Sequence, residues 1–241
     1  MVREISIVFP AYNEEENVGE SARRAVEAAE AAGISDFEIL FVDDGSRDAT
    51  AARVEALAAA DPRIRLIRHP RNLGYAMALK TGFEAASKRY IFYSDSDNQF
   101  DMKEMKNFLP AIDDYDIVVG FRIYRFDPLT RLFLAWCYNL AARMIFRIRV
   151  RDIDCAFKLF RREVFDVITI ESKKFFVDTE ILAKAVRHKM RVTEIGVRHY
   201  PRPAGRSTVR ASHVFSTIRE LIQMWIKIYL RSDKPERPSS A

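Results

Sequence analysis

Short runs of β-branched and aromatic side chains alternate with longer alanine-rich stretches over the first 120 residues. The apolar runs are bounded by polar residues and predict five strands, at 4–10, 37–44, 63–69, 89–95 and 115–121. The stretches between them carry apolar side chains at helical spacing and predict four helices, at 15–32, 48–60, 75–87 and 102–112. Strands that alternate with helices are typical of βαβ units, so we expect an α/β fold with a mostly parallel sheet flanked by helices.

The pattern changes after Gly120. Pro128 suits the first turn of a helix that we predict to reach residue 147, apolar on most faces and with Arg131 near its start. The stretch 152–170 has a mixed pattern. The later elements that we predict are a helix at 177–188, a strand at 190–199, a basic loop at 200–210 and an amphipathic helix at 211–230. We therefore expect one domain over 1–210, a C-terminal amphipathic helix over 211–230 and a disordered tail over 231–241.

Charge is divided unevenly along the chain. Residues 1–120 hold 14 Lys+Arg and 22 Asp+Glu, whereas residues 121–241 hold 25 and 12, so a formal net charge of +5 hides halves of −8 and +13. The basic half suits an anionic partner, and charge alone leaves open nucleic acid, a phospholipid surface or a phosphorylated substrate. The apolar helix at 128–147 favours a membrane surface, with a place in the core as the alternative.

The sequence also indicates a compartment. Cys137 and Cys155 have no second pair nearby, so we expect neither a disulfide framework nor a zinc site, and a reducing cytoplasm fits. The N-terminal apolar run is too short for a secretory signal. The longest uncharged stretch, 132–142, is well short of the roughly 20 residues of a spanning helix. We expect the protein to contact a membrane peripherally, on its cytoplasmic face.

Polar clusters follow three of the predicted strands. They are Pro10, Tyr12, Asn13 and Glu14 after the first, Asp43 to Ser46 after the second, and Asp95 to Gln99 after the fourth. Because ligands of such sheets bind beyond the carboxyl ends of the strands, we expect the clusters to meet at one edge.

Two carboxylates in Asp95-Ser96-Asp97 can hold one divalent cation and leave positions open for phosphate oxygens, and Gln99 can add a neutral oxygen. A plain turn at the end of a strand is the alternative. Asp43 can accept hydrogen bonds from a nucleoside, although Asp43 to Ser46 also reads as a turn before a helix cap.

Eight segments, in this order and spacing, resemble the family-2 glycosyltransferases of the GT-A fold. They are FPAYNEEENV, FVDDGSRDAT, RNLGYAMALKTGF, SDSDNQF, VVGFR, RDIDCAFKLFRREVF, FFVDTEI and HYPRPAGRST. Within that family the chain is most similar to dolichyl-phosphate mannose synthases and bacterial polyprenyl-phosphate hexosyltransferases, over about residues 4 to 210. The resemblance implies an inverting transfer of a hexose from a nucleotide sugar, of the GDP-mannose or UDP-glucose type, to a polyprenyl or dolichyl phosphate. A membrane-spanning partner protein would fit that role.

The same resemblance assigns roles to residues. It implies nucleoside binding by Pro10, Tyr12, Glu14 and Asp43, and binding of Mg²⁺ or Mn²⁺ on the donor diphosphate by Asp95, Asp97 and Gln99. Phosphate binding falls to Arg122, Arg131, Arg202 and Arg206. Asp152 is a candidate for orienting the acceptor or the sugar, or else for pairing with a neighbouring arginine.

One departure from the family bears on specificity. Asp154-Cys155-Ala156 stands where many relatives have Thr-Ser-Gly, so the sugar and the acceptor are less constrained than the fold. A family-2 enzyme with a saccharide or small-molecule acceptor is the first alternative. A sugar-phosphate nucleotidyltransferase would want a glycine-rich turn after the first strand, where this chain has FPAYNEEEN. A nucleic-acid-binding module lacks a recognition motif here, so we expect no nucleic-acid partner.

Overall fold

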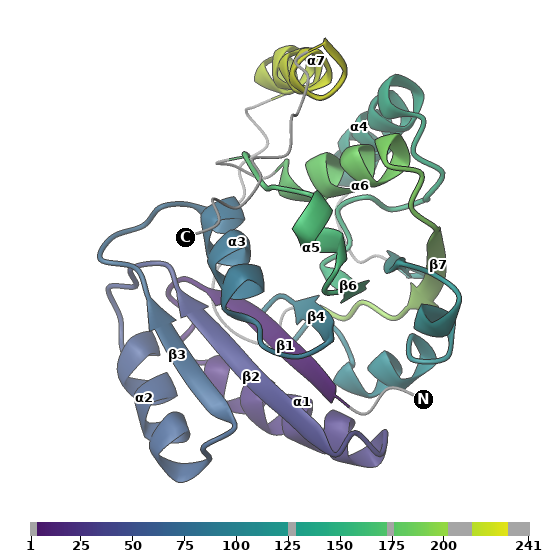
Figure 1. Cartoon of the computed structure of the whole chain (residues 1–241). Helices are drawn as coiled ribbons and strands as arrows, with labels where there is room; N and C mark the ends of the chain where they lie inside the picture. Colours follow the sequence, from purple (N-terminus) through teal and green to yellow (C-terminus); the bar gives the residue numbers. More distant parts are fainter. Residues whose placement is uncertain (1–3, 125–128, 173–175, 202–213, 231–241) are drawn as a thin grey trace, which may run out of the picture.

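The computed structural model describes residues 4–124, 129–172, 176–201 and 214–230, and leaves aside the side chains of 130, 131 and 214–220. Seven strands form one mixed sheet in the order β3-β2-β1-β4-β6-β5-β7 (Figure 1). The strands are β1 (Glu4–Ala11), β2 (Asp36–Asp43), β3 (Ile64–Arg68), β4 (Tyr90–Ser94), β5 (Ile117–Arg122), β6 (Phe157–Arg161) and β7 (Val192–Val197). The predicted α/β class, the mostly parallel sheet and all six predicted strands are confirmed.

The helices follow the predicted pattern with two exceptions: the helix predicted at 102–112, and the short helix α5, which was not predicted. They are α1 (Val18–Ala31), α2 (Thr50–Ala60), α3 (Tyr75–Ala85), α4 (Leu129–Phe146), α5 (Val164–Val167), α6 (Val177–Arg187) and α7 (Val214–Leu230). The helix predicted at 102–112 is instead two 3₁₀ segments, η1 (Met102–Asn107) and η2 (Ala111–Asp113). Pro110 separates them, because its ring and its missing N–H disfavour an uninterrupted α-helix.

The mixed stretch 152–170 contains the one antiparallel strand. β6 pairs antiparallel with β4 on one side and with β5 on the other, and its first four residues are buried. Lys158 is one of these, with only 1% of its surface exposed. A charged residue in a central strand interrupts the apolar run, which explains why the sequence pattern gave no single element there.

The two faces of the sheet are covered by different helices. In β4, Phe92 packs edge-to-face on Phe108, which follows η1, whereas the next residue, Tyr93, packs on Phe83 of α3. Successive side chains of a strand point to opposite faces, so η1 and α3 lie on opposite sides. α1 and α2 contact each other, and α1 contacts η1, which places these helices on the η1 side.

Helices α4, α6 and α7 contact one another at one end of the molecule (Figure 1). The hydroxyl of Tyr229 in α7 lies 3.5 Å from the main-chain oxygen of Phe146, the last residue of α4. Among the described residues, no helix is both long and apolar enough to cross a bilayer.

Candidate active site

The polar clusters that follow β1, β2 and β4 lie along one edge of the sheet. These strands are parallel neighbours in the order β2-β1-β4, so their carboxyl ends meet. Ser96 Oγ donates to the main-chain oxygen of Pro10 at 2.9 Å, and the amide of Asp44 donates to Ala11 O at 2.8 Å. The three polar clusters therefore meet at one edge of the sheet, as expected.

The loop from Asp95 to Gln99 is fastened to the start of α1. Ser21 Oγ lies 2.9 Å from Ser96 O and 3.1 Å from Asn98 Oδ1, and Asn98 Nδ2 donates to Asn17 O at 3.1 Å. Asn98 adopts a φ of 59°, a left-handed conformation that asparagine tolerates better than most residues. The two carboxylates of the loop are thus presented from a fixed main chain.

The carboxylate of Asp95 sits in an environment that opposes its charge. Burial and the nearby carboxylate of Asp97 raise the pKa of Asp95 to about 7, although the Tyr75 hydroxyl, which donates to Asp95 Oδ1 at 2.9 Å, favours the ionised form. Such a site gains from an added positive charge. A divalent cation would supply it and restore full ionisation.

The remaining oxygens of this loop suit a hard cation. The amide of Gln99 donates to Asp97 Oδ1 at 3.2 Å, and Gln99 Nε2 donates to the main-chain oxygen of Tyr200 at 2.9 Å. Nowhere in the described part of the chain do three His, Cys, Asp or Glu side chains gather as a metal site on their own. Two carboxylates and an amide oxygen fit Mg²⁺ or Mn²⁺ when phosphate or water completes the coordination.

A hollow opens beyond the ends of β2 and β3. It has a volume of about 290 Å³ and is lined by Gly45, Ser46, Arg68, His69 and Pro70. Asp43 ends β2 beside it and is fully buried.

The carboxylate of Asp43 is half satisfied. Its Oδ1 accepts from the amide of Ser46 at 3.0 Å, while Oδ2 has no hydrogen-bond partner among the residues that the structure describes. The Nε of Arg68 lies 3.4 Å from that oxygen. A buried acceptor without a donor is costly, so this atom marks a place where a ligand's N–H or O–H would be stabilised.

The neighbouring carboxylate, Asp44, is fully engaged in holding a loop. It accepts from the amides of Leu73 and Gly74 and from His69 Nδ1, each at 2.8 Å. The loop also crosses close to Gly45, where an added Cβ would lie 2.4 Å from a main-chain carbon of Arg71. Asp44 and His69 are therefore structural, and Asp43 is the acid left for a ligand.

Two other predicted nucleoside ligands occupy the turn after β1. Tyr12 is half-buried at the end of the strand. Glu14 accepts from Asn17 Nδ2 at 2.6 Å, and its amide donates to Thr50 Oγ1 at 2.8 Å, which links the turn to α1 and α2. Both lie at the same edge as Asp43.

Arg122, at the end of β5, and Asp152 form a largely buried ion pair. Arg122 Nε and Nη2 donate to the two carboxylate oxygens of Asp152 at 2.6 and 2.7 Å. Burial alone would lower the pKa of Arg122, but its hydrogen bonds to the carboxylate of Asp152 outweigh burial and raise that pKa above its usual value. The predicted pairing of Asp152 with a neighbouring arginine is what the structure contains.

The sequence pattern did not predict a buried hydrogen-bond network around Lys158. Lys158 Nζ donates to Asp178 Oδ1 and to Cys155 O at 2.6 Å each, and lies 3.0 Å from the hydroxyl of Tyr93. Tyr93 in turn donates to Asp178. Only the position of Lys158 in an apolar run hinted at this network.

Asp154 lies near the same network. Burial and the charges of Asp178 and Asp152 raise the pKa of Asp154 to about 7. Asp154 belongs to the Asp154-Cys155-Ala156 segment, which stands where many relatives have Thr-Ser-Gly.

Three predicted phosphate ligands cannot be placed. Arg202 and Arg206 lie outside the described residues. The main chain of Arg131 belongs to the first turn of α4, and its side chain is outside the description.

Comparison with known proteins settles the family. The model of glycosyl transferase family 2 matches residues 6–169, which include the Asp95–Gln99 loop, Arg122 and Asp152. The chain belongs to glycosyl transferase family 2. Among curated members of related sequence, glycosyltransferase AglD of Haloferax volcanii is 34% identical over 83% of this chain and 33% of its own length.

Two further relatives carry lipid phosphates in their names. Dodecaprenyl-phosphate galacturonate synthase of Rhizobium johnstonii is 29% identical over 92% of this chain and 66% of its own length. Undecaprenyl-phosphate 4-deoxy-4-formamido-L-arabinose transferase of Pseudomonas fluorescens is 32% identical over 90% of this chain and 63% of its own. The chain thus spans a third of the first relative and less than two thirds of these two.

Solved structures confirm the predicted GT-A fold. Mannosyl-3-phosphoglycerate synthase from Rubrobacter xylanophilus has a TM-score of 0.71 at 16% identity and covers 99% of this chain and 78% of its own. Glucosyl-3-phosphoglycerate synthase from Mycobacterium tuberculosis, solved with Mn²⁺, UDP and phosphoglyceric acid, has a TM-score of 0.67 at 18% identity and covers 93% and 78%. At these identities the likeness to the solved structures shows the fold alone.

Proposed function

We propose that this chain is an inverting hexosyltransferase that moves a sugar from a nucleotide sugar to a polyprenyl or dolichyl phosphate at a membrane surface. The observation that carries the proposal is the common edge of the sheet, shared by Asp95, Asp97 and Asp43, whose Oδ2 has no hydrogen-bond donor among the described residues. One end of this edge suits a cation and the other a nucleoside, as a nucleoside diphosphate requires. The lipid-phosphate relatives in family 2 support the acceptor class.

Asp95, Asp97 and Gln99 would hold Mg²⁺ or Mn²⁺ together with the donor diphosphate. When bound, such an ion offsets the charge that develops on the departing nucleoside diphosphate. The solved neighbour with Mn²⁺ and UDP supports this class of cofactor. Tyr75 orients Asp95 through its hydrogen bond, so the site is preformed on the protein side.

The nucleoside would bind at the hollow beside Asp43. Asp43 Oδ2 can accept a hydrogen bond and the guanidinium of Arg68 can donate one, and Arg68 Nε lies 3.4 Å from Asp43 Oδ2. A base edge that offers an N–H next to a carbonyl oxygen would satisfy both groups. Uracil and guanine each present such an edge, so this pair fits a UDP- or a GDP-linked sugar. Pro10, Tyr12 and Glu14 would complete the nucleoside site.

The acceptor phosphate would be bound by Arg122, with Arg131, Arg202 and Arg206 as further candidates. Asp152 fixes two nitrogens of Arg122, and the third, Nη1, remains for a phosphate oxygen. A phosphate monoester is already anionic near neutral pH, so its attack on the anomeric carbon needs positioning more than deprotonation. Displacement from the side opposite the departing diphosphate inverts the configuration at that carbon.

The membrane-facing surface would include α4. Five large apolar side chains at helical spacing are exposed on it, namely Leu129, Phe133, Trp136, Leu140 and Met144. α7 adds exposed Ile222, Ile226 and Leu230. Apolar surface of this extent on a basic half of the chain suits an anionic phospholipid surface, on the cytoplasmic side, alone or beside a membrane-spanning partner.

A small-molecule acceptor is the second candidate. The solved neighbours that transfer a sugar to 3-phosphoglycerate share the fold and also use an anionic acceptor. The two candidates differ in the apolar chain of the acceptor, because only a lipid would benefit from the exposed face of α4.

A single assay separates these candidates. The purified protein is incubated with Mn²⁺ and a panel of nucleotide sugars, and release of the nucleoside diphosphate is followed with polyprenyl phosphate or with phosphoglyceric acid. We expect turnover with polyprenyl phosphate. Turnover with phosphoglyceric acid alone would favour the second candidate, and release with neither acceptor would count against both.

A further inference from the structure

Two segments that are distant in sequence pair beside the Asp95–Gln99 loop. The amide of Tyr200 donates to the main-chain oxygen of Gln99 at 2.8 Å, and Gln99 Nε2 returns a hydrogen bond to Tyr200 O at 2.9 Å. Phe100 and His199 form an isolated antiparallel bridge, with ring centroids 5.0 Å apart. Phe100 also packs on Phe157 of β6, at 5.3 Å, which anchors this junction in the core.

These contacts fix the orientation of the Gln99 carboxamide. A main-chain oxygen can only accept, so the NH₂ end of Gln99 must face Tyr200. Oε1 is then the end that can serve a cation. The amide of Gln99 meanwhile donates to Asp97 Oδ1 at 3.2 Å, so one residue contacts both the acidic loop and the 199–201 segment.

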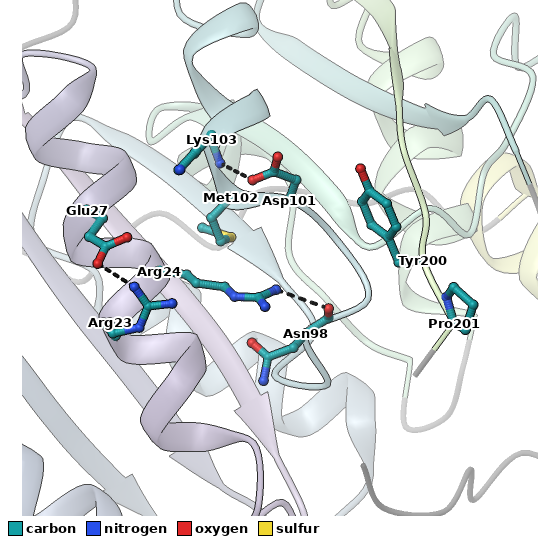
Figure 2. A pocket seen from close by; sticks show the side chains of 9 residues that line it. All are labelled: Arg23, Arg24, Glu27, Asn98, Asp101, Met102, Lys103, Tyr200 and Pro201. Carbon is teal, nitrogen blue, oxygen red and sulfur yellow. Dashed lines mark hydrogen bonds and ion pairs between the residues drawn. The ribbon is translucent and has the colours of Figure 1, made fainter. Parts of the chain in front are cut away.

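One side of the 199–201 segment borders a hollow. A hollow of about 500 Å³ separates Tyr200 and Pro201 from Arg23 and Arg24 of α1, and Figure 2 shows the two groups on opposite sides of it. Tyr200 is 41% exposed. The hydrogen bonds at Gln99 and the bridge between Phe100 and His199 therefore help to place this segment beside the hollow.

We propose that Gln99 is a positioning residue that couples cation binding at the Asp95–Gln99 loop to the placement of the 199–201 segment. The inference rests on the proposed metal-dependent transfer. A cation that binds Oε1 holds Nε2 against Tyr200, and a fixed Tyr200 holds Oε1 toward the cation, because a ligand oriented by a second hydrogen bond binds its metal better.

The test uses Gln99→Glu, which keeps an oxygen for the cation and removes the N–H that Tyr200 accepts. Gln223→Glu, an exposed position on α7, is the matched control for the change in charge. Hydrogen exchange at the amide of Tyr200 is measured in the full chain, first in EDTA and then with Mn²⁺ and UDP. Binding of Mn²⁺ is measured separately for each protein.

In EDTA we expect exchange at Tyr200 to be about three to ten times faster in Gln99→Glu than in the wild type, the effect of losing one hydrogen bond. Mn²⁺ with UDP should slow exchange in the wild type at least about threefold, and should fail to do so in Gln99→Glu even though that variant binds Mn²⁺. Gln223→Glu should match the wild type in both conditions.

The outcomes separate this inference from the proposed function. Equal exchange of the wild type and Gln99→Glu in EDTA would overturn the inference, whatever the transferase activity. The same slowing by Mn²⁺ and UDP in both proteins would also overturn it. A wild type that transfers sugar with Mn²⁺ while Tyr200 exchange stays unchanged would remove the coupling and leave the proposed function intact, whereas a wild type that binds no Mn²⁺ with UDP would contradict both.

Discussion

Asp152 holds the guanidinium of Arg122 through two hydrogen bonds. Arg122 ends β5, 30 residues before Asp152 in the chain. The pair is nearly hidden, with 12% of the Arg122 side chain and 10% of the Asp152 side chain exposed. A guanidinium fixed in this way presents its remaining nitrogen in one direction. That geometry leads to the first prediction.

Asp152→Asn should weaken use of the lipid phosphate, because Arg122 loses one of its two fixed hydrogen bonds and its orientation. We expect the KM for polyprenyl phosphate to rise about tenfold or more, with the affinity for the nucleoside diphosphate unchanged. Steady-state kinetics with the acceptor varied measures the first, and calorimetric titration of UDP or GDP the second.

Glu194→Gln provides the control for that substitution. Glu194 accepts from Arg151, which is 61% exposed, so this variant breaks an ion pair at the surface. It should leave both constants unchanged. A KM for the lipid that stays constant in Asp152→Asn, or falls, would contradict a role for Arg122 in phosphate binding.

The raised pKa of Asp154 predicts that the wild-type protein loses stability as the pH rises. Burial and the charges of Asp178 and Asp152 raise this pKa from 3.8 to about 7 in the folded protein. Between these two values the unfolded chain releases the proton and the folded chain keeps it, so the free energy of unfolding falls as pH rises. Asp154→Asn abolishes that loss.

The variant should therefore match the wild type near pH 4 and be more stable near pH 8, by about 4 kcal/mol if the full shift is expressed. Urea unfolding in EDTA at both pH values measures this, with Asp114→Asn as an exposed control. A variant that gains equally at both pH values, or only at pH 4, would mean that Asp154 is ionised normally in the fold.

The exposed face of α4 predicts binding to lipid. Phe133 and Trp136 are about 60% exposed, and their rings lie 6.1 Å apart. Replacing both with serine should weaken binding to vesicles of anionic phospholipid about tenfold or more, because two large apolar side chains no longer enter the interface. Co-sedimentation with vesicles gives the affinity.

Tyr115→Ser serves as the comparison, since Tyr115 is an exposed aromatic residue outside α4 and α7. It should bind vesicles as the wild type does. If the double variant on α4 also binds like the wild type, the membrane surface lies elsewhere on the molecule.

The sequence predicted the parts of the structure that depend on local pattern. The strands of the βαβ units are short runs rich in β-branched and aromatic side chains, and β1, β2 and β4 each end in a polar cluster, so the shared edge with Asp43 and Asp95 followed from the topology of parallel sheets. The sequence offered pairing with a neighbouring arginine as one alternative for Asp152, but it did not identify Arg122, 30 residues away, as the partner.

Other features depend on contacts that no local pattern reveals. Lys158 interrupts β6, and its partner Asp178 is 20 residues away at the start of α6, so neither the strand nor the buried network could be predicted from period alone. Tyr75 reaches Asp95 across a similar distance in sequence. The hydrogen bond from Gln99 to Tyr200 joins residues 101 positions apart.

Asp97→Asn tests the central claim, that a cation at the Asp95–Gln99 loop is needed for sugar transfer. The substitution keeps the shape of the side chain and removes the charge that would bind the ion. The measurement is the rate of nucleoside diphosphate release with polyprenyl phosphate and Mn²⁺, on protein whose thermal unfolding matches the wild type. We expect a loss of at least about 100-fold, together with full loss of wild-type activity in EDTA. Transfer by Asp97→Asn at the wild-type rate would contradict the account.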